Sequence, residues 1–210
     1  MMTTTMISKP NFNKAEKAAY QLLSDNGVKE LPVKIKRLAK KYPHLKIKSY
    51  TWFGQKNGMT IEEVCRFAES NEGCCYYRKF DHQYLILYND TVQNIGRIRW
   101  TIAHELGHFI LKHNEITNKT ILARSSLAQT EYEAFEKEAD CFARSLLAPL
   151  SVLSALKRLT VKDIIEWCSL SKEAAINTLK FFNKGIKLGR KYNPNDRLVK
   201  LFSNFIFLKK

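Results

Sequence analysis

Two histidines flank a glutamate in the stretch TIAHELGHFI, residues 101–110, and this spacing could bind a metal ion. On a helix, residues four apart lie within about 40° of each other and about 6 Å along the axis, so the rings of His104 and His108 can reach one ion. Glu105 leans to the same side and can reach water at that ion without being a ligand. The pattern predicts a hydrolytic zinc site with Glu105 as general base. The alternative is a core helix that carries two hydrogen-bonded histidines.

A catalytic zinc ion needs a third protein ligand and an open position. The stretch EKEAD, residues 136–140, follows His108 after 27 intervening residues. Glu136 and Asp140 share a helix face, so one carboxylate can bind the ion while the other accepts the N–H of a ligating histidine. Glu138 is a rival ligand, but it points about 200° away from Glu136, and we expect it to face solvent. The alternative is an acidic, solvated helix face.

Gly107, between the two histidines, is a poor helix former and costs about 1 kcal/mol relative to alanine. Its presence within a helix predicts that another segment packs closely against that turn.

Helices must carry both groups of candidate ligands, and we expect them over 94–113 and 130–149, the second with Thr130 as N-cap and Pro149 as stop. The stretches GCCYYRKF and QYLILYND predict a β-hairpin with its turn around Asp81–His82. The other expected elements are helices over 14–27 (Gly27 as C-cap), 31–43 and 60–70 (capping box Thr60–Glu63), a strand over 45–53, and helices over 151–158, 161–168 and 171–183 (Ser151 and Ser171 as caps).

The chain has 210 residues, of which 45% are hydrophobic and 11% aromatic, enough for a packed core. No stretch approaches the roughly 20 apolar residues of a membrane helix, and the N-terminus lacks the apolar block of a secretory signal. The five cysteines are scattered, with no CxxC pair for a cysteine zinc site. These features favour a protein of the reducing cytoplasm.

The net charge of +15 is concentrated in two segments. Residues 29–48 hold eight lysines and arginines against one glutamate, and residues 180–210 hold nine against one aspartate. Such segments could attract an acidic partner, including nucleic acid, or they could simply keep the protein in solution. Residues 159–182 faintly suggest a helix-turn-helix, but the turn lacks glycine, and we expect a plain helical bundle.

The stretches IRWTIAHELGHFILKH and FEKEADCFARSLLAP together resemble the ImmA/IrrE family of metallopeptidases, which belong with the thermolysin-like gluzincins. The resemblance runs over 31–149 and is strongest over 84–149. It implies one zinc ion per chain, with His104, His108 and Glu136 as ligands and Glu105 as catalytic base. The family more often has asparagine where this chain has Asp140, for which a hydrogen bond to a ligand histidine is the expected role.

The expected fold class is α+β. A small sheet that contains antiparallel strands packs on the helical pair of a zincin, and a helical C-terminal part follows. We expect a flexible lead-in over 1–13, a zinc metallopeptidase domain over 14–149 and a helical, basic region over 150–210.

The resemblance also implies a function: an endopeptidase that cleaves a regulatory protein, a helix-turn-helix repressor of a phage or mobile element. The alternative is a non-cleaving, zinc-containing regulatory protein that binds a repressor or DNA through the basic segments. The intact Glu105 favours the protease, because a purely structural site does not need it.

Two features of the catalytic site stay open at the level of sequence. The strand over 83–89 could present an edge to an extended substrate, or it could be a plain buried strand with Leu85 and Leu87 inward. His113 is expected to be an ordinary surface histidine. The candidates for the group that stabilises the oxyanion are Tyr84, Tyr88, Tyr132, Arg144 and His113.

Overall fold

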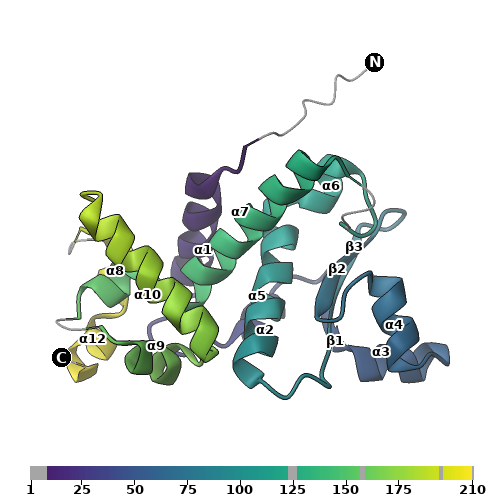
Figure 1. Cartoon of the computed structure of the whole chain (residues 1–210), viewed down its shortest axis with the longest axis horizontal. Helices are drawn as coiled ribbons and strands as arrows, with labels where there is room; N and C mark the ends of the chain where they lie inside the picture. Colours follow the sequence, from purple (N-terminus) through teal and green to yellow (C-terminus); the bar gives the residue numbers. More distant parts are fainter. Residues whose placement is uncertain (1–8, 123–126, 157–158, 194–195, 210) are drawn as a thin grey trace.

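The computed structural model describes residues 9–122, 127–156, 159–193 and 196–209 (Figure 1). The elements of this part of the chain are α1 (Phe12–Asp25), α2 (Ile35–Ala39), β1 (Leu45–Ser49), α3 (Tyr50–Asn57), α4 (Ile61–Ala68), β2 (Gly73–Arg78), β3 (Gln83–Tyr88), α5 (Ile95–Leu111), α6 (His113–Thr117), α7 (Gln129–Leu147), α8 (Leu150–Ser154), α9 (Val161–Cys168), α10 (Lys172–Lys187), α11 (Arg197–Leu201) and α12 (Ser203–Lys209). The predicted lead-in over 1–13 and the predicted helix over 151–158 lie partly outside the described residues.

The three strands form one mixed sheet in the order β1-β3-β2. β2 and β3 form the predicted antiparallel hairpin, with Gly73 opposite Tyr88 and Arg78 opposite Gln83. β1 runs parallel to β3 on its other side, and the antiparallel β2 lies between the two in sequence. β3 is therefore the central strand, hydrogen-bonded along both sides.

Helices cover both faces of this sheet, which explains why β3 is so apolar. Ile86 is fully buried on the face that packs against α5, and Leu87 is fully buried on the other face, under α3 and α4. Figure 1 shows the resulting layers: α3 and α4 on one side of the sheet, α5 on the other, and α7 with α1 beyond α5. The α+β class is confirmed.

α5 and α7 form the helical pair behind the sheet. A Cβ atom on Gly107 would lie 3.1 Å from Cδ1 of Phe142 and 3.3 Å from Cα of Ala139, both on α7. The predicted close packing at this glycine is confirmed. Because Gly107 lies between the two histidines, the close approach also brings α7 to the motif.

The C-terminal helices share the main hydrophobic core with the rest of the molecule. That core includes Leu23 of α1, Leu106 of α5 and Phe142 of α7, and it continues through Ile164 of α9 and Phe202 beside α11. The boundary at 149/150 stays a prediction. In the part of the chain that the structure describes, no helix has the length and apolar character needed to cross a bilayer.

Several predicted element ends are confirmed and others are wrong. The capping box of Thr60 and Glu63 is present, and Ser171 caps α10. The predicted strand over 45–53 is wrong beyond Ser49, whose side chain accepts a hydrogen bond of 3.2 Å from the backbone N–H of Trp52 and so begins α3. The short α2 replaces the longer helix predicted over 31–43. Leu31 and Tyr42 each precede a proline, which disfavours the helical conformation at these two positions.

Two predicted caps lie inside helices instead. Thr130 lies within α7, whose N-cap is Ala128, and Ser151 lies within α8, whose N-cap is Pro149. Ser151 is buried there. α10 runs past its predicted end at residue 183 to Lys187.

Candidate active site

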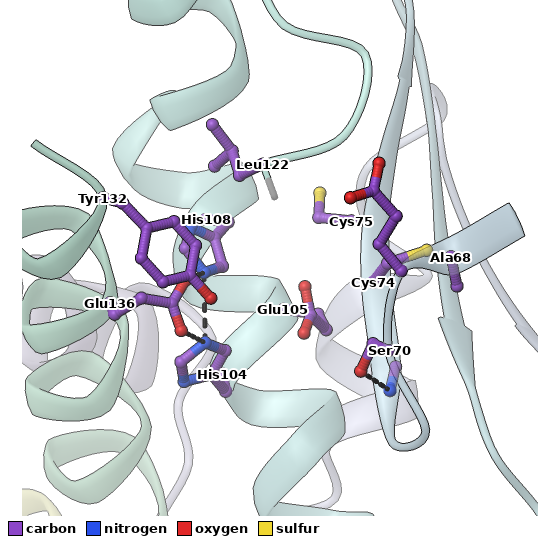
Figure 2. A pocket seen from close by; sticks show the side chains of 12 residues that line it. Ala68, Ser70, Cys74, Cys75, His104, Glu105, His108, Leu122, Tyr132 and Glu136 are labelled. Atoms are coloured by element: carbon purple, nitrogen blue, oxygen red, sulfur yellow. Dashed lines mark hydrogen bonds and ion pairs between the residues drawn. The ribbon is translucent and has the colours of Figure 1, made fainter. Parts of the chain in front are cut away.

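The three predicted ligands come from the two helices that pack side by side. His104 and His108 lie on α5, and Glu136 lies on α7. The Nε2 atom of His104 is 3.1 Å from Nε2 of His108 and 3.4 Å from Oε2 of Glu136. The Nε2 atom of His108 is 3.3 Å from Oε1 of Glu136. Figure 2 shows these side chains facing one another beside a cavity.

This donor set fits a zinc ion. One donor atom from each of the three residues lies within 4.8 Å of the others, close enough for a single cation to contact all of them. Two imidazole nitrogens and one carboxylate form a set that catalytic zinc sites use, with the fourth position left open. Nδ1 of His104 faces the Asp140 carboxylate, which accepts its hydrogen, so the Nε2 lone pair of His104 is available to the ion. Nδ1 of His108 contacts Nδ1 of His113. His104, His108 and Glu136 are therefore the residues that would hold it.

Asp140 lies one helical turn after Glu136 and faces the same histidine. Its Oδ1 atom is 3.0 Å from Nδ1 of His104, and its side chain is 53% exposed. The expected role of Asp140, a hydrogen bond to a ligand histidine, requires this arrangement.

Glu138 and His113 contradict the sequence-based predictions of solvent exposure. Glu138 is 4% exposed and His113 is 0% exposed. The Nδ1 atom of His113 is 2.9 Å from Nδ1 of His108, and its Nε2 atom is 3.1 Å from Oε2 of Glu138. Burial lowers the pKa of His113 to about 4, although Glu138 opposes this shift. His113 therefore lies behind His108 as a neutral imidazole.

A local feature of the backbone brings His113 to that place. α5 ends at Leu111, and Lys112 has a left-handed conformation with φ of 62°. The chain therefore turns at Lys112, and His113 begins α6 with its ring against Phe135 of α7, at a centroid distance of 4.5 Å. Glycine or asparagine is the usual signal for such a turn. A lysine gives no such signal, which is why the sequence predicts a continuous helix over 94–113.

Glu105 lies between the two histidines in sequence, and it lines the cavity beside them. It is 9% exposed, and the backbone of Cys75 on β2 lowers the pKa of its carboxyl. Burial raises the pKa of the Glu105 carboxyl, while the nearby imidazoles of His104 and His108 oppose the shift. A carboxylate with raised proton affinity beside the three donors is suited to act as a base.

The cavity has a volume of about 500 Å³ and opens between the sheet and the helical pair. It is lined by Ala68, Glu69, Ser70, Gly73, Cys74, Cys75, His104, Glu105, His108, Leu122, Tyr132 and Glu136. Of the five candidates for oxyanion stabilisation, Tyr132 lines it, and Figure 2 shows its ring beside Glu136.

The other four candidates do not line the cavity. His113 lies behind His108. The Tyr84 hydroxyl donates to Glu115 at 2.9 Å, and the Tyr88 hydroxyl accepts from Lys36 at 2.8 Å. The Arg144 guanidinium lies over the Phe181 ring at 3.7 Å.

The strand that borders the cavity is β2, not β3. The suggestion that β3 presents an edge to substrate is wrong, because β1 and β2 pair with both of its sides. Among the residues that the structure describes, β2 pairs with a strand on one side only, and its residues Gly73, Cys74 and Cys75 line the cavity. A Cβ atom on Gly73 would lie 2.6 Å from Cγ2 of Thr101 and 2.7 Å from the Leu87 carbonyl oxygen, so only glycine fits there.

A comparison with known protein families supports this description of the site. The family described as the IrrE N-terminal-like domain, peptidase M78, matches residues 64–180. Among curated proteins, none matches the chain. The family match includes β2, β3 and both helices that carry the donor atoms, and it covers more than half of the chain. The chain therefore belongs to the IrrE N-terminal-like (M78, ImmA/IrrE) family of metallopeptidases.

Proposed function

We propose that the protein is a zinc-dependent endopeptidase in which His104, His108 and Glu136 bind the metal and Glu105 is the catalytic base. One observation carries the proposal: three donor atoms from α5 and α7 converge beside a buried glutamate at the floor of a cavity. Membership of a metallopeptidase family supports the same reaction class.

The proposed chemistry divides between the ion and the chain. Zinc in such a site supplies Lewis-acid chemistry: it lowers the pKa of water and polarises a carbonyl oxygen. Glu105 takes a proton from the attacking water at its carboxylate and later delivers it to the leaving amine. The Cys75 backbone favours the charged form of the Glu105 carboxylate, and Tyr132, which lines the cavity, is the residue that we assign to hydrogen-bond the carbonyl oxygen as it gains charge.

The shape of the site suits an extended peptide. β2 borders the cavity, but its outward backbone N–H groups already have partners: Gly73 donates to Oγ of Ser70 at 3.2 Å, and Tyr77 donates to the Thr120 carbonyl oxygen at 2.8 Å. We therefore place an extended substrate in the cavity alongside β2, without adding it to the sheet as a further strand. From the family resemblance, we take the substrate to be a helix-turn-helix repressor of a phage or mobile element. We place the reaction in the cytoplasm, because all five cysteines are free thiols.

The test is cleavage of candidate repressors by the purified, zinc-loaded chain. We expect a defined fragment that disappears with EDTA and returns with added zinc. Glu105→Gln should keep the fold and the bound zinc but lower the cleavage rate by at least about 100-fold, because it removes the base. Circular dichroism and metal analysis of the variant provide the control. Cleavage by Glu105→Gln at the wild-type rate would exclude this mechanism.

The same variant separates the protease from a non-cleaving regulator. If Glu105→Gln retains full biological activity, the protein acts by binding its partner. A DNA-binding role through the basic segments 29–48 and 180–210 would also give an affinity for duplex DNA that falls steeply with salt.

A further inference from the structure

A continuous, buried chain of hydrogen bonds runs from His108 to the start of α1. His108 contacts His113 through the two Nδ1 atoms at 2.9 Å, and His113 contacts Oε2 of Glu138 through Nε2 at 3.1 Å. The other oxygen of Glu138 accepts a hydrogen bond of 2.6 Å from the backbone N–H of Asn11. The side chains of His108, His113 and Glu138 are 3%, 0% and 5% exposed, so water does not compete for these bonds.

The direction of every bond in this chain follows from its ends. The Asn11 N–H can only donate, and the Glu138 carboxylate can only accept, so Glu138 must receive a proton donor from His113. A His108 that binds metal through Nε2 has its hydrogen on Nδ1, so it donates to Nδ1 of His113 across the 2.9 Å contact, and the hydrogen of His113 lies on Nε2, towards Glu138. This arrangement leaves Nε2 of His108 with a free lone pair that faces His104 and Glu136.

We propose that His113 and Glu138 are positioning residues that fix the tautomer and the ring orientation of His108 for metal binding. Glu138 accepts a hydrogen bond from Nε2 of His113, and this bond favours the His113 tautomer whose Nδ1 accepts from His108. Glu138 thus influences the tautomer of His108 without contacting it. This proposal rests on the metal-binding part of the proposed function. It extends the site from the ligand helices α5 and α7 to Asn11 at the start of α1, where the Asn11 side chain also caps the helix.

The rival explanation is that His113 and Glu138 form a buried pair that only supports the fold. The two explanations differ in what a replacement changes. A purely structural pair affects the stability of the protein, but it leaves the zinc affinity of correctly folded molecules unchanged. A positioning role affects zinc affinity, because loss of such outer hydrogen bonds to a ligand typically weakens metal binding by about 10–100-fold.

The test measures the zinc dissociation constant of the full-length chain by competition with a chromophoric chelator. His113→Leu removes both hydrogen bonds, and we expect its affinity to fall by about 10–100-fold. His113→Gln can still accept with its amide oxygen and donate with its amide nitrogen, so it should restore the affinity to within a few-fold of wild type. Glu138→Gln has one acceptor oxygen for two donors, and its affinity should lie between these values.

Matched controls make the same chemical changes outside this chain of bonds. His44→Gln changes an exposed histidine, and Glu115→Gln changes a carboxylate that accepts a hydrogen bond from Tyr84. Both should bind zinc as wild type does. Thermal unfolding of each variant without metal shows the folded fraction at the assay temperature, so affinities are compared between folded molecules.

A spectroscopic measurement reads the predicted tautomers directly. In zinc-loaded wild-type protein labelled with ¹⁵N-histidine, we expect the hydrogen of His113 on Nε2 and the hydrogen of His108 on Nδ1. A His113 protonated on Nδ1, or wild-type affinity in folded His113→Leu, would overturn the proposal. If wild type itself binds no zinc, the proposed function fails; if wild type binds zinc and His113→Leu binds it equally well, only the positioning proposal fails.

Discussion

At the scale of single residues, the two ligand histidines have very different surroundings. Nδ1 of His104 meets Asp140, a carboxylate that is 53% exposed to water. Nδ1 of His108 meets the buried His113. Water can replace Asp140 as a hydrogen-bond acceptor, but nothing can replace a buried partner without leaving a polar group unpaired. Changes behind His108 should therefore weaken the site more than Asp140→Asn does.

Tyr132 gives a prediction at the same scale. Tyr132→Phe removes only the hydroxyl and should lower kcat for peptide cleavage by about 100-fold or more, because an oxyanion loses a hydrogen-bond donor. The zinc dissociation constant should stay unchanged. Tyr88→Phe is the matched control, since the Tyr88 hydroxyl contacts Lys36 instead of lining the cavity. Equal kcat values for both variants would remove Tyr132 from the mechanism.

Much of the candidate site, but not all of it, could be predicted from the sequence. His104, His108 and Glu105 follow from a local spacing on one helix, and the family resemblance pointed to Glu136. His113 and Glu138 could not be found in this way, because their proximity depends on the left-handed turn at Lys112 and on how α7 lies against it. Helical geometry correctly placed Glu138 on a different face of the helix from Glu136. It could not show that this face is buried, because the burial depends on the tertiary packing around α7.

At the scale of elements, the function of α5 depends on contacts at both of its ends. Its C-terminal half packs on α7 through Gly107, and its first turn packs on the turn between α9 and α10 through Gly96. A Cβ atom on Gly96 would lie 2.6 Å from the carbonyl carbon of Leu170, where only backbone could yield. The C-terminal helices thereby fix the start of the helix that carries the two histidines.

This contact predicts opposite effects for two glycine substitutions. Gly96→Ala should lower the free energy of unfolding by about 1–3 kcal/mol, because backbone must move to admit the methyl group. Gly185→Ala in α10 should be neutral or should raise it by up to about 1 kcal/mol, since the new Cβ would be 3.4 Å from a flexible Arg190 side chain. Urea denaturation of both variants measures the difference. A Gly96→Ala variant as stable as Gly185→Ala would contradict the contact.

The elements also show where sequence patterns are informative. Strong local signals, such as the capping box of Thr60 and Glu63 and the β-hairpin, gave the correct elements. The alternation that begins at Leu45 gave a correct strand but a wrong end, because Ser49 caps a helix before the predicted end of the strand. The central position of β3 could not be predicted, since the pairing with β1 joins segments that are distant in sequence.

At the scale of the whole molecule, the proposed metal would join two parts of the chain that the sequence separates. His104 and His108 lie on α5, and Glu136 lies on α7, with α6 between these helices in sequence. An ion held by all three residues binds only the folded chain, so its binding free energy adds to the stability of the fold. At a zinc concentration 100 times the dissociation constant, this addition is about 2.7 kcal/mol.

The most direct test is therefore the thermal unfolding of the purified chain with and without zinc, together with the metal content. Wild type should bind one zinc ion per chain, and its Tm should rise by roughly 5–10 °C at that concentration. Glu133→Gln, an exposed change on the same helix, should respond as wild type does. Glu136→Gln should show little or no rise. A wild-type Tm that does not change with zinc, or a Tm of Glu136→Gln that rises as much as that of wild type, would contradict a metal centre built from α5 and α7.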